Sequence, residues 1–145
     1  MRGFSLIELL VVISIISLLT LVATPSFSSF IKRDRIVSNA NQLHSLYKFA
    51  RSEAIKREQT VLLEASSGQW RVLADIDGTE TVMKTFTPSH QTINVVLQNV
   101  TISAAGELKT AYQFVVTDND DETDDHQLCI LQSGQSWLLD LPGAC

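Results

Sequence analysis

The sequence is short of the residues that build most catalytic and metal centres. Its 145 residues include two cysteines and three histidines, with no C-x-x-C pair and no Cys/His spacing suited to zinc. His44, His90 and His126 have no serine or cysteine motif around them that resembles a nucleophile site. We therefore expect a protein that is not an enzyme, with no metal site and no cofactor.

Basic residues are scarce in the C-terminal part of the chain. Residues 61–145 contain three Lys/Arg and twelve Asp/Glu, a net charge of −9, whereas residues 1–60 contain eight and four, a net of +4. An acidic domain lacks the clustered basic surface that phosphate neutralisation needs, so a large nucleic-acid footprint is not expected. The length allows one anchor helix and one small domain, and the sequence shows no internal repeat and no long linker.

One long apolar run is present, at the N-terminus. From Phe4 to Ala23 the side chains are apolar except for four hydroxyls and a single carboxylate, Glu8. These twenty residues, at ~1.5 Å each, span roughly 30 Å, the thickness of the hydrocarbon core of a bilayer. A carboxylate in such a span costs on the order of 3 kcal/mol by insertion scales, so Glu8 is expected to meet a partner charge.

The run opens with Gly3-Phe4-Ser5-Leu6-Ile7-Glu8-Leu9-Leu10-Val11-Val12. This stretch resembles the class III signal of type IV pilins and type II secretion pseudopilins. The resemblance implies cleavage between Gly3 and Phe4 by a prepilin peptidase, followed by N-methylation of Phe4. It also implies that Glu8 pairs with the N-terminal amine of a neighbouring subunit during filament assembly. Because Phe4 and Glu8 are one helical turn apart, the amine could also be partnered within one subunit.

Two plainer interpretations account for less of this segment. An ordinary secretory signal has an apolar core of about 7–15 residues and a small-residue cleavage site. This run is longer and has no good Ala-x-Ala site. A plain single-pass anchor leaves Glu8 unexplained. Charge does not decide the orientation, because Arg2 flanks one end while Lys32, Arg33 and Arg35 flank the other.

After the run, the pattern predicts that one helix continues to about Arg57. Pro25 predicts a kink, and pilins similarly carry a proline near this depth. Apolar residues then recur at three- and four-residue spacing on one helical face: Ile36, Val37, Ala40, Leu43, Tyr47, Ala50 and Ala54. We expect Ala54 to pack, and Arg51 and Glu53 to face solvent or a strand edge.

From Thr60 the pattern changes to that of strands. About seven are expected, near residues 60–66, 69–76, 80–87, 92–103, 112–117, 126–132 and 136–141. The predicted fold class is α+β, a long N-terminal helix packed on a small antiparallel β-sheet head, as in pilins. The predicted division is residues 1–3, prepilin leader peptide; 4–24, transmembrane and filament-core helix; 25–59, its amphipathic continuation; and 60–145, periplasmic β-rich head.

A narrower resemblance comes from the octet Ala50-Arg51-Ser52-Glu53-Ala54-Ile55-Lys56-Arg57, followed by one strand and by Trp70 in the next. This layout is similar to the GspH/FimT branch of minor pilins and pseudopilins, and we expect Trp70 in the core or at its rim. Some FimT-type minor pilins are DNA receptors with a Gly-Arg-x-Arg motif near the C-terminus. The matching stretch here, Gly134-Gln135-Ser136-Trp137, lacks both arginines.

Two features of the acidic head leave alternatives open. In an oxidising periplasm Cys129 and Cys145 could close a loop of about 17 residues, and we expect this disulfide, with two unrelated thiols as the alternative. Six acidic residues lie between 118 and 125. They lack the glycine and the final glutamate of an EF-hand loop, so a solvated hairpin loop is expected, with calcium binding as the alternative.

The resemblance implies a minor pilin that is processed by prepilin peptidase and takes part in initiating or capping a type IV pilus. Its partners would be other pilins, and its place the inner membrane, as a single pass with a periplasmic head. A location at the filament tip on the cell surface is also open. A type II secretion pseudopilin H is the first alternative, and a DNA-uptake receptor the second.

Overall fold

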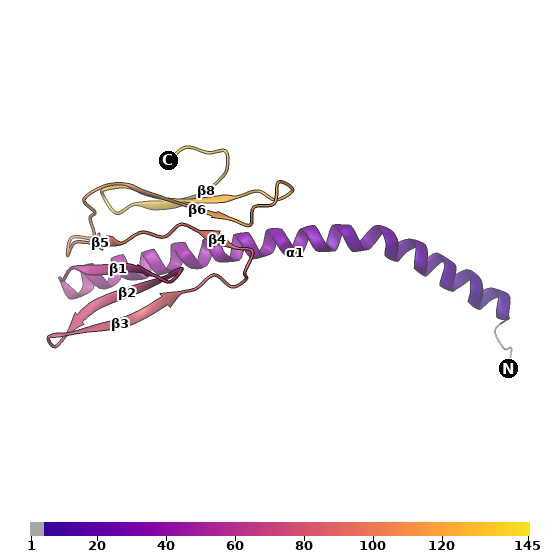
Figure 1. Cartoon of the computed structure of the whole chain (residues 1–145), viewed down its shortest axis with the longest axis horizontal. Helices are drawn as coiled ribbons and strands as arrows, with labels where there is room; N and C mark the ends of the chain where they lie inside the picture. Colours follow the sequence, from indigo (N-terminus) through magenta and orange to yellow (C-terminus); the bar gives the residue numbers. More distant parts are fainter. Residues whose placement is uncertain (1–4) are drawn as a thin grey trace.

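One helix forms the N-terminal part of the molecule. The computed structural model describes residues 5–145 except for the side chains of residues 21–26, and in it α1 (Leu6–Arg57) spans 52 residues. The predicted helix is therefore confirmed over this length. The backbone stays helical through position 25, and α1 curves gently over its N-terminal half (Figure 1). A kink at Pro25 remains a prediction, because its side chain is among those not described.

Glu58 caps the C-terminal end of α1. This residue adopts a left-handed conformation with φ of 55°, and its backbone N–H donates to the carbonyl oxygens of Ala54 and Ile55. Such a cap satisfies carbonyl groups that have no partner within the helix. Lys56 and Arg57 also place positive charge in the last turn, where the helix dipole favours it.

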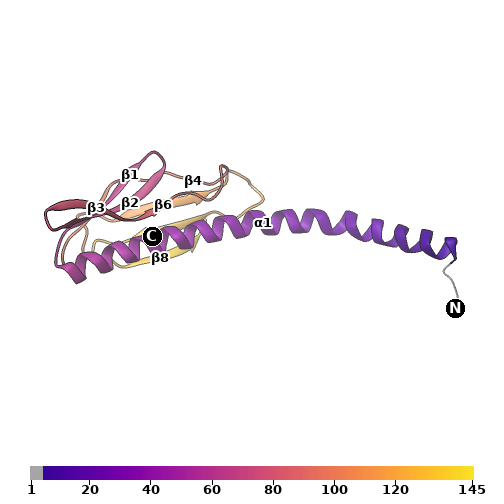
Figure 2. The same ribbon diagram turned by 90° about the horizontal axis from the view of Figure 1, so that it is seen from below.

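Two antiparallel sheets pack against the C-terminal half of α1 and form the head (Figures 1 and 2). The first has the order β3-β2-β1-β5 and is built from β1 (Val61–Ser66), β2 (Gln69–Ile76), β3 (Thr79–Phe86) and β5 (Val100–Ile102). The second has the order β4-β6-β7-β8 and is built from β4 (Asn94–Val95), β6 (Tyr112–Thr117), β7 (His126–Ile130) and β8 (Ser136–Asp140). The predicted α+β class, a long helix on antiparallel strands, is confirmed.

One predicted strand, 92–103, is wrong. The structure divides it into β4 and β5, which belong to different sheets. The residues between them bond to the first sheet through single polar groups, since the Gln98 carbonyl accepts the Trp70 indole N–H at 2.9 Å and the Asn99 side chain accepts the Ala65 amide at 2.8 Å. The chain therefore crosses from one sheet to the other here, although its alternating pattern is that of one continuous strand.

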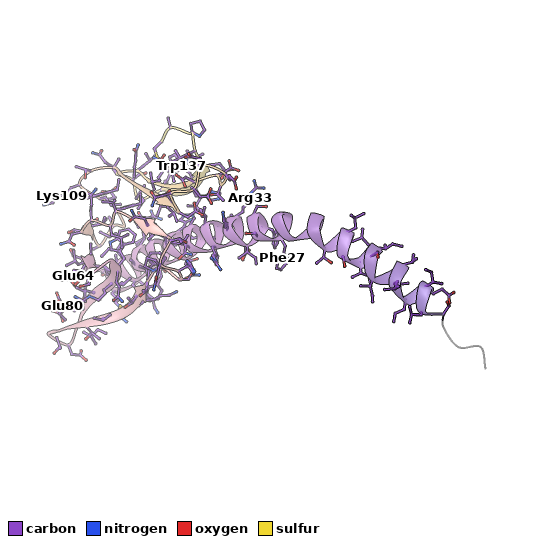
Figure 3. All side chains as sticks on the ribbon, turned by 45° about the vertical axis from the view of Figure 1, so that its right-hand side comes forward. Phe27, Arg33, Glu64, Glu80, Lys109 and Trp137 are labelled. Carbon is purple, nitrogen blue, oxygen red and sulfur yellow. A yellow bond between two sulfur atoms is a disulfide. The ribbon has the colours of Figure 1, made fainter. Side chains whose placement is uncertain are left out.

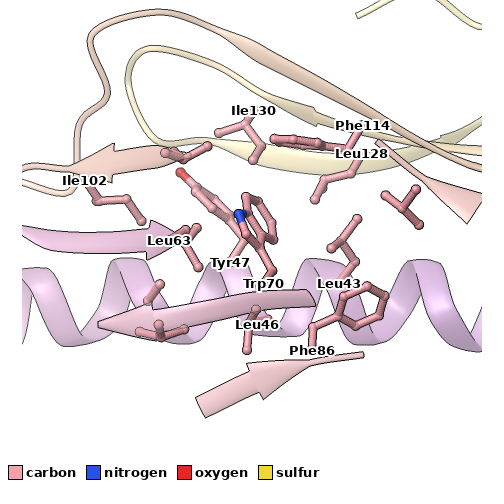
Figure 4. Packing of buried hydrophobic residues seen from close by; sticks show 14 of the residues in the cluster. Leu43, Leu46, Tyr47, Leu63, Trp70, Phe86, Ile102, Phe114, Leu128 and Ile130 are labelled. Carbon is pink, nitrogen blue, oxygen red and sulfur yellow. The ribbon is translucent and has the colours of Figure 1, made fainter. Parts of the chain in front are cut away.

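The core fills the space between α1 and both sheets (Figure 4). Trp70 from β2 is fully buried and packs on Phe114 from β6, with ring centroids 4.8 Å apart. This aromatic contact joins the two sheets, and α1 closes the core from below with Leu43, Leu46 and Tyr47. The prediction that Trp70 is a core residue is confirmed.

The predicted disulfide is also confirmed. Cys129, fully buried in β7, is bonded to Cys145 at the last position, with Cα atoms 5.6 Å apart. The bond ties the C-terminal tail to the centre of the second sheet. Without it the tail would be free to fray, as chain ends generally are.

We expect Cys145→Ser to lower the free energy of unfolding by about 3 kcal/mol, because the bond closes a short loop in the unfolded chain. Thermal unfolding of the detergent-solubilised protein, followed by circular dichroism, measures this effect. Ala144→Ser is the matched control, since it changes the neighbouring exposed residue and leaves the disulfide in place. Reductant should lower the midpoint of the parent to that of Cys145→Ser, and an unchanged parent would contradict the prediction.

Candidate functional site

The N-terminal end of α1 carries the single carboxylate of the apolar run. Ser5 is the N-cap residue, and its backbone N–H donates to Oε2 of Glu8 at 3.0 Å. Gly3 and Phe4, the predicted cleavage and methylation residues, lie outside the described residues. The Glu8 carboxylate thus binds the backbone N–H of Ser5, the residue that follows Phe4 in the sequence. A negative charge is also favoured here by the helix dipole.

The hydroxyl groups of this segment are satisfied within the helix. Ser14, Ser17 and Thr20 each donate to the carbonyl oxygen four residues earlier. The surface is otherwise formed by exposed apolar side chains, namely Leu6, Ile7, Leu9, Leu10, Val11, Val12, Ile13, Ile15, Ile16, Leu18 and Leu19. Of the polar side chains that the structure describes between Leu6 and Thr20, Glu8 is therefore the one that can offer a charge to another molecule.

Over the part of the chain that the structure describes, no helix has the length and hydropathy of a membrane span.

A second charged feature lies where the stem meets the head, near Arg33 in Figure 3. The loop between β6 and β7, residues 118–125, reaches α1 and bonds to it there. Lys32 Nζ lies 2.6 Å from Asp120 Oδ2, and Arg33 pairs more loosely with Asp124 at 3.5 Å. The acidic loop, predicted to be solvated, is thus held at one side by the basic stem. We call this pair of contacts the junction clamp.

The ion pair between Lys32 and Asp120 in the junction clamp is stable over a wide pH range. The hydrogen bond from Lys32 and its charge hold the pKa of the Asp120 carboxyl below its usual range, and the same bond raises the pKa of Lys32. A lowered carboxyl pKa contributes stability at neutral pH that is lost as pH falls through it, and a raised lysine pKa contributes stability that is lost at strongly alkaline pH. Lys32 and Asp120 are therefore both charged between these limits, and their ion pair is then complete.

We expect Lys32→Ala to increase hydrogen exchange in residues 118–125 by about two- to five-fold, with little change in global unfolding, because exposed ion pairs are weak. Exchange followed by mass spectrometry on the full-length protein measures this. Lys109→Ala, at the opposite end of the head, is the matched control (Figure 3). Acidification below the pKa of Asp120 should raise hydrogen exchange in the parent loop to the level of the Lys32→Ala variant. Equal exchange of the two at neutral pH would refute the clamp.

Within the described residues, no three potential ligand side chains converge to hold a metal ion. Two acidic side chains of the loop, those of Asp118 and Asp120, accept hydrogen bonds from the loop itself. Asp118 Oδ1 accepts the Thr123 hydroxyl at 2.6 Å and the Asp120 amide at 3.2 Å. These contacts shape the loop as a turn.

Arg51 joins α1 to two glycine turns of the head. Its Nε donates to the Gly106 carbonyl at 2.9 Å, and its terminal nitrogen lies 3.4 Å from the Ser133 carbonyl. One turn earlier, the buried Tyr47 hydroxyl donates to the Gly134 carbonyl at 2.9 Å. Burial raises the pKa of Tyr47 to about 12, so the hydroxyl keeps its proton at physiological pH. We predicted that Arg51 faces solvent or a strand edge. In the structure it binds two glycine turns instead, and Gly106 and Gly134 were the residues in the sequence that could have indicated these turns.

The predicted environment of Glu53 is wrong. Its side chain is buried, and its carboxylate pairs with Arg57 at 2.7 Å and lies 4.0 Å from Lys56. Arg57 lies one turn further along α1, where it covers the carboxylate and neutralises it. Ala54 is buried, as predicted.

The three histidines lie in separate places and have different partners. His44 Nε2 lies 2.9 Å from Ser136 Oγ, and burial followed by the charge of Lys48 lowers the pKa of His44. His126 pairs with Asp140 at 2.7 Å, and His90 bonds to Thr92 in its own turn. In the described part of the chain no carboxylate is bonded to His44, so the His44–Ser136 contact lacks the group that would orient the histidine as a base.

The stretch that matches the DNA-binding motif of some pilins lies beside α1. Gly134, Gln135, Ser136 and Trp137 form one wall of an open groove, and Lys48, Arg51, Ser52 and Ile55 form the other. Gln135 is exposed and neutral, so it contributes no charge to this surface. The positive charge in the groove comes from α1.

A curved helix with an exposed apolar half, one carboxylate near its start and a two-sheet head on its other half defines a pilin-type subunit. Comparison with known sequences agrees. Residues 39–134 match the family described as type II transport protein GspH, and residues 1–24 match the prokaryotic N-terminal methylation motif. The chain therefore belongs to the GspH family, which includes type IV minor pilins and type II secretion pseudopilins.

The fold is that of a solved minor pilin. A crystal structure of the type IV minor pilin FimU from Pseudomonas aeruginosa superposes with a TM-score of 0.65 at 19% sequence identity, over 76% of this chain and 92% of that one. A second crystal form of FimU gives 0.59 at 20% identity, over 70% and 90%. No curated protein matches the sequence with significance.

Proposed function

We propose that this chain is a minor pilin that takes part in initiating or capping a type IV pilus. The observation that carries the proposal is the isolated Glu8 carboxylate, which lies in an otherwise apolar, exposed half-helix inside a segment that matches the methylation motif. In surroundings of low dielectric a carboxylate pairs or protonates, and the amine of a neighbouring subunit is the partner that an assembling filament supplies.

In this proposal a prepilin peptidase removes residues 1–3 between Gly3 and Phe4, and Phe4 is then N-methylated. Residues 4–24 lie in the inner membrane before assembly and in the filament core afterwards. Residues 25–59 continue the helix, and residues 60–145 form the periplasmic head that contacts other pilins or, at the tip, the cell exterior. The role is structural and does not include catalysis.

A pseudopilin of a type II secretion system is the first alternative, because the family includes such proteins and both machines use the same N-terminal chemistry. A DNA-uptake receptor is the second, and the neutral Gln135 together with the net charge of −9 over residues 61–145 disfavours it.

The deciding experiment is deletion of the chain, with surface pili, protein secretion and DNA uptake scored in the same cells. Loss of pili, restored by the parent chain, is expected. Normal pili would reject the proposal, and the trait that failed instead would identify the machine: secretion for a pseudopilin, DNA uptake for a receptor.

A further inference from the structure

The open groove between α1 and β8 carries positive charge that no acidic group of its own lining balances. It has a volume of about 660 Å³ and is lined by Lys48, Arg51, Ser52, Ile55 and residues 134–137, with no carboxylate among them. We call it the basic groove. A space of this size can take a few side chains of another molecule. Its positive charge contrasts with the net charge of −9 over residues 61–145.

Neither cation of the basic groove has a carboxylate partner in the part of the chain that the structure describes. Lys48 is exposed and makes no ion pair there. Arg51 is half-buried, and it donates only to neutral backbone carbonyls, those of Gly106 and Ser133. Because a guanidinium has five N–H donors, Arg51 keeps donors for an incoming anion.

The walls of the basic groove are fixed before any partner arrives. The buried Tyr47 hydroxyl donates to the Gly134 carbonyl at 2.9 Å, and Arg51 holds the neighbouring turns. A surface that needs no ordering on binding loses less conformational entropy. Trp137 forms an apolar wall of the same groove. Tryptophan and arginine are enriched among the residues that contribute most to protein–protein binding, so this lining suits a protein partner.

We propose that the basic groove binds an acidic segment of a different pilin, a chain other than this one, with carboxylates of that segment facing Lys48 and Arg51. The inference rests on the proposed function, because initiation or capping of a pilus places this chain next to other pilins. Complementary charges across an interface determine partner and register more than affinity. The groove therefore selects which pilin lies beside this chain and at which height along α1.

Charge complementarity favours a short acidic segment over nucleic acid. The two cations of the basic groove match a few carboxylates, whereas a nucleic acid would place a long row of phosphates along the acidic head, where few cations can replace its counterions. A second copy of this chain is disfavoured as well. A contact between the groove of one copy and another surface of the next would extend into a row, whereas the proposed function places this chain among other pilins.

Photo-crosslinking of the full-length chain in intact bacteria tests the contact. The photoreactive amino acid p-benzoylphenylalanine replaces Gln135, an exposed and neutral residue of the basic groove, so that Lys48, Arg51 and Trp137 all remain. We expect an adduct with another pilin, whose crosslinked peptide, sequenced by mass spectrometry, contains at least two Asp or Glu residues. The same replacement at Ser45, which lines the separate groove between α1 and β3, should not give this adduct.

Charge variants separate electrostatic recognition from chance proximity. Lys48→Glu in the photoreactive chain should reduce the adduct about tenfold, since each ~1.4 kcal/mol of lost pairing is a factor of ten. Lys109→Glu, an equal change of charge on the same head but outside the basic groove, should leave the adduct unchanged. Arg51 is not varied, because it also holds two turns of the head.

Charge exchange on the partner completes the test. Replacing the carboxylates of the crosslinked peptide by lysine should weaken the adduct of the parent chain and restore the adduct of Lys48→Glu. A contact that depends on shape alone would not show this reversal. Immunoblots check that all variants are present in the membrane in equal amounts, and Lys48 is exposed, so its replacement leaves the core intact.

Several results would overturn the inference: no adduct from position 135, an adduct with this chain itself or with DNA, a crosslinked pilin peptide without acidic residues, or equal effects of Lys48→Glu and Lys109→Glu. Pili are counted in the same cells. A missing adduct with pili that still depend on the chain rejects the groove contact alone, whereas pili that do not depend on the chain reject the proposed function.

Discussion

Gly134→Ala should destabilise the head by about 4 kcal/mol or more, because an added Cβ comes closer to other atoms here than at any other glycine that the structure describes. Gly134 has a φ of 79°, a left-handed conformation that strains any residue with a Cβ atom. A Cβ built there would lie 1.9 Å from the Gly106 carbonyl oxygen and 2.4 Å from Arg51 Nε. The backbone of the Gly106 turn cannot move aside cheaply.

The methyl group would also disturb the contacts that dock α1 on the head. Arg51 holds the Gly106 and Ser133 carbonyls, and Tyr47 donates to the carbonyl of Gly134 itself. Displacing this turn weakens hydrogen bonds worth about 1 kcal/mol each and adds an overpacking cost of roughly 1–3 kcal/mol. For a chain of this size we expect the melting midpoint to fall by on the order of 10 °C.

Gly78→Ala is the matched control. Gly78 has nearly the same backbone conformation, with a φ of 80°, but no atom lies within 4 Å of a Cβ built there. It should cost only the strain of a left-handed residue, about 1 kcal/mol. Equal losses for both variants in thermal unfolding, followed by circular dichroism on the detergent-solubilised chain, would show that backbone strain alone matters and would reject the role of the Arg51 contacts.

Glu8→Ala should leave processing by the peptidase intact and reduce incorporation into filaments by on the order of 100-fold. Removing one partner of a buried ion pair costs roughly 3 kcal/mol or more, and each 1.4 kcal/mol is about a tenfold change in an equilibrium. Quantitative immunoblotting of sheared surface filaments measures incorporation, and the size of the membrane-bound chain reports processing.

Glu8→Gln separates charge pairing from helix capping. The Glu8 carboxylate also accepts the Ser5 amide, and a glutamine side chain can keep that hydrogen bond but carries no charge. If pairing is the reason for the residue, Glu8→Gln fails as Glu8→Ala does. Normal incorporation of Glu8→Gln would assign Glu8 to the cap and reject the pairing. Ser17→Ala, which removes a hydroxyl already bonded within α1, should assemble normally.

Local patterns predicted most of the elements, because each depends on neighbours in sequence. The three-to-four spacing of Ile36, Ala40 and Leu43 places one face of α1 in the core. Turn pairs such as Asp77-Gly78 mark the hairpin between β2 and β3, since only a residue tolerant of positive φ fits there. The prediction of one strand over residues 92–103 was wrong because alternation shows that a segment is extended but does not show which sheet it joins.

Local sequence patterns could not predict which charged residues contact each other. Asp120 lies 88 residues from Lys32, and Gly106 lies 55 residues from Arg51, so neither pair leaves a local signal. The prediction that Glu53 is exposed or at a strand edge was wrong for a related reason. Its burial depends on how the head covers that face of α1, although its partner Arg57 is one turn away. The sequence showed that positive charge gathers on the helix and negative charge on the head, but not which residues meet.

The sequence by itself determined the helix, the antiparallel head, the apolar half with its single carboxylate, and the disulfide between Cys129 and Cys145. These follow from short-range periodicity, from turn chemistry and from the resemblance of the N-terminus to a processed signal. Only the tertiary structure decided that the head consists of two sheets, that Arg51 locks two glycine turns, and that a basic groove and an acidic loop lie at opposite ends of one sheet. The physical reason is that these features arise from contacts across the chain, whose energies depend on distance in space and leave no trace in the order of neighbouring residues.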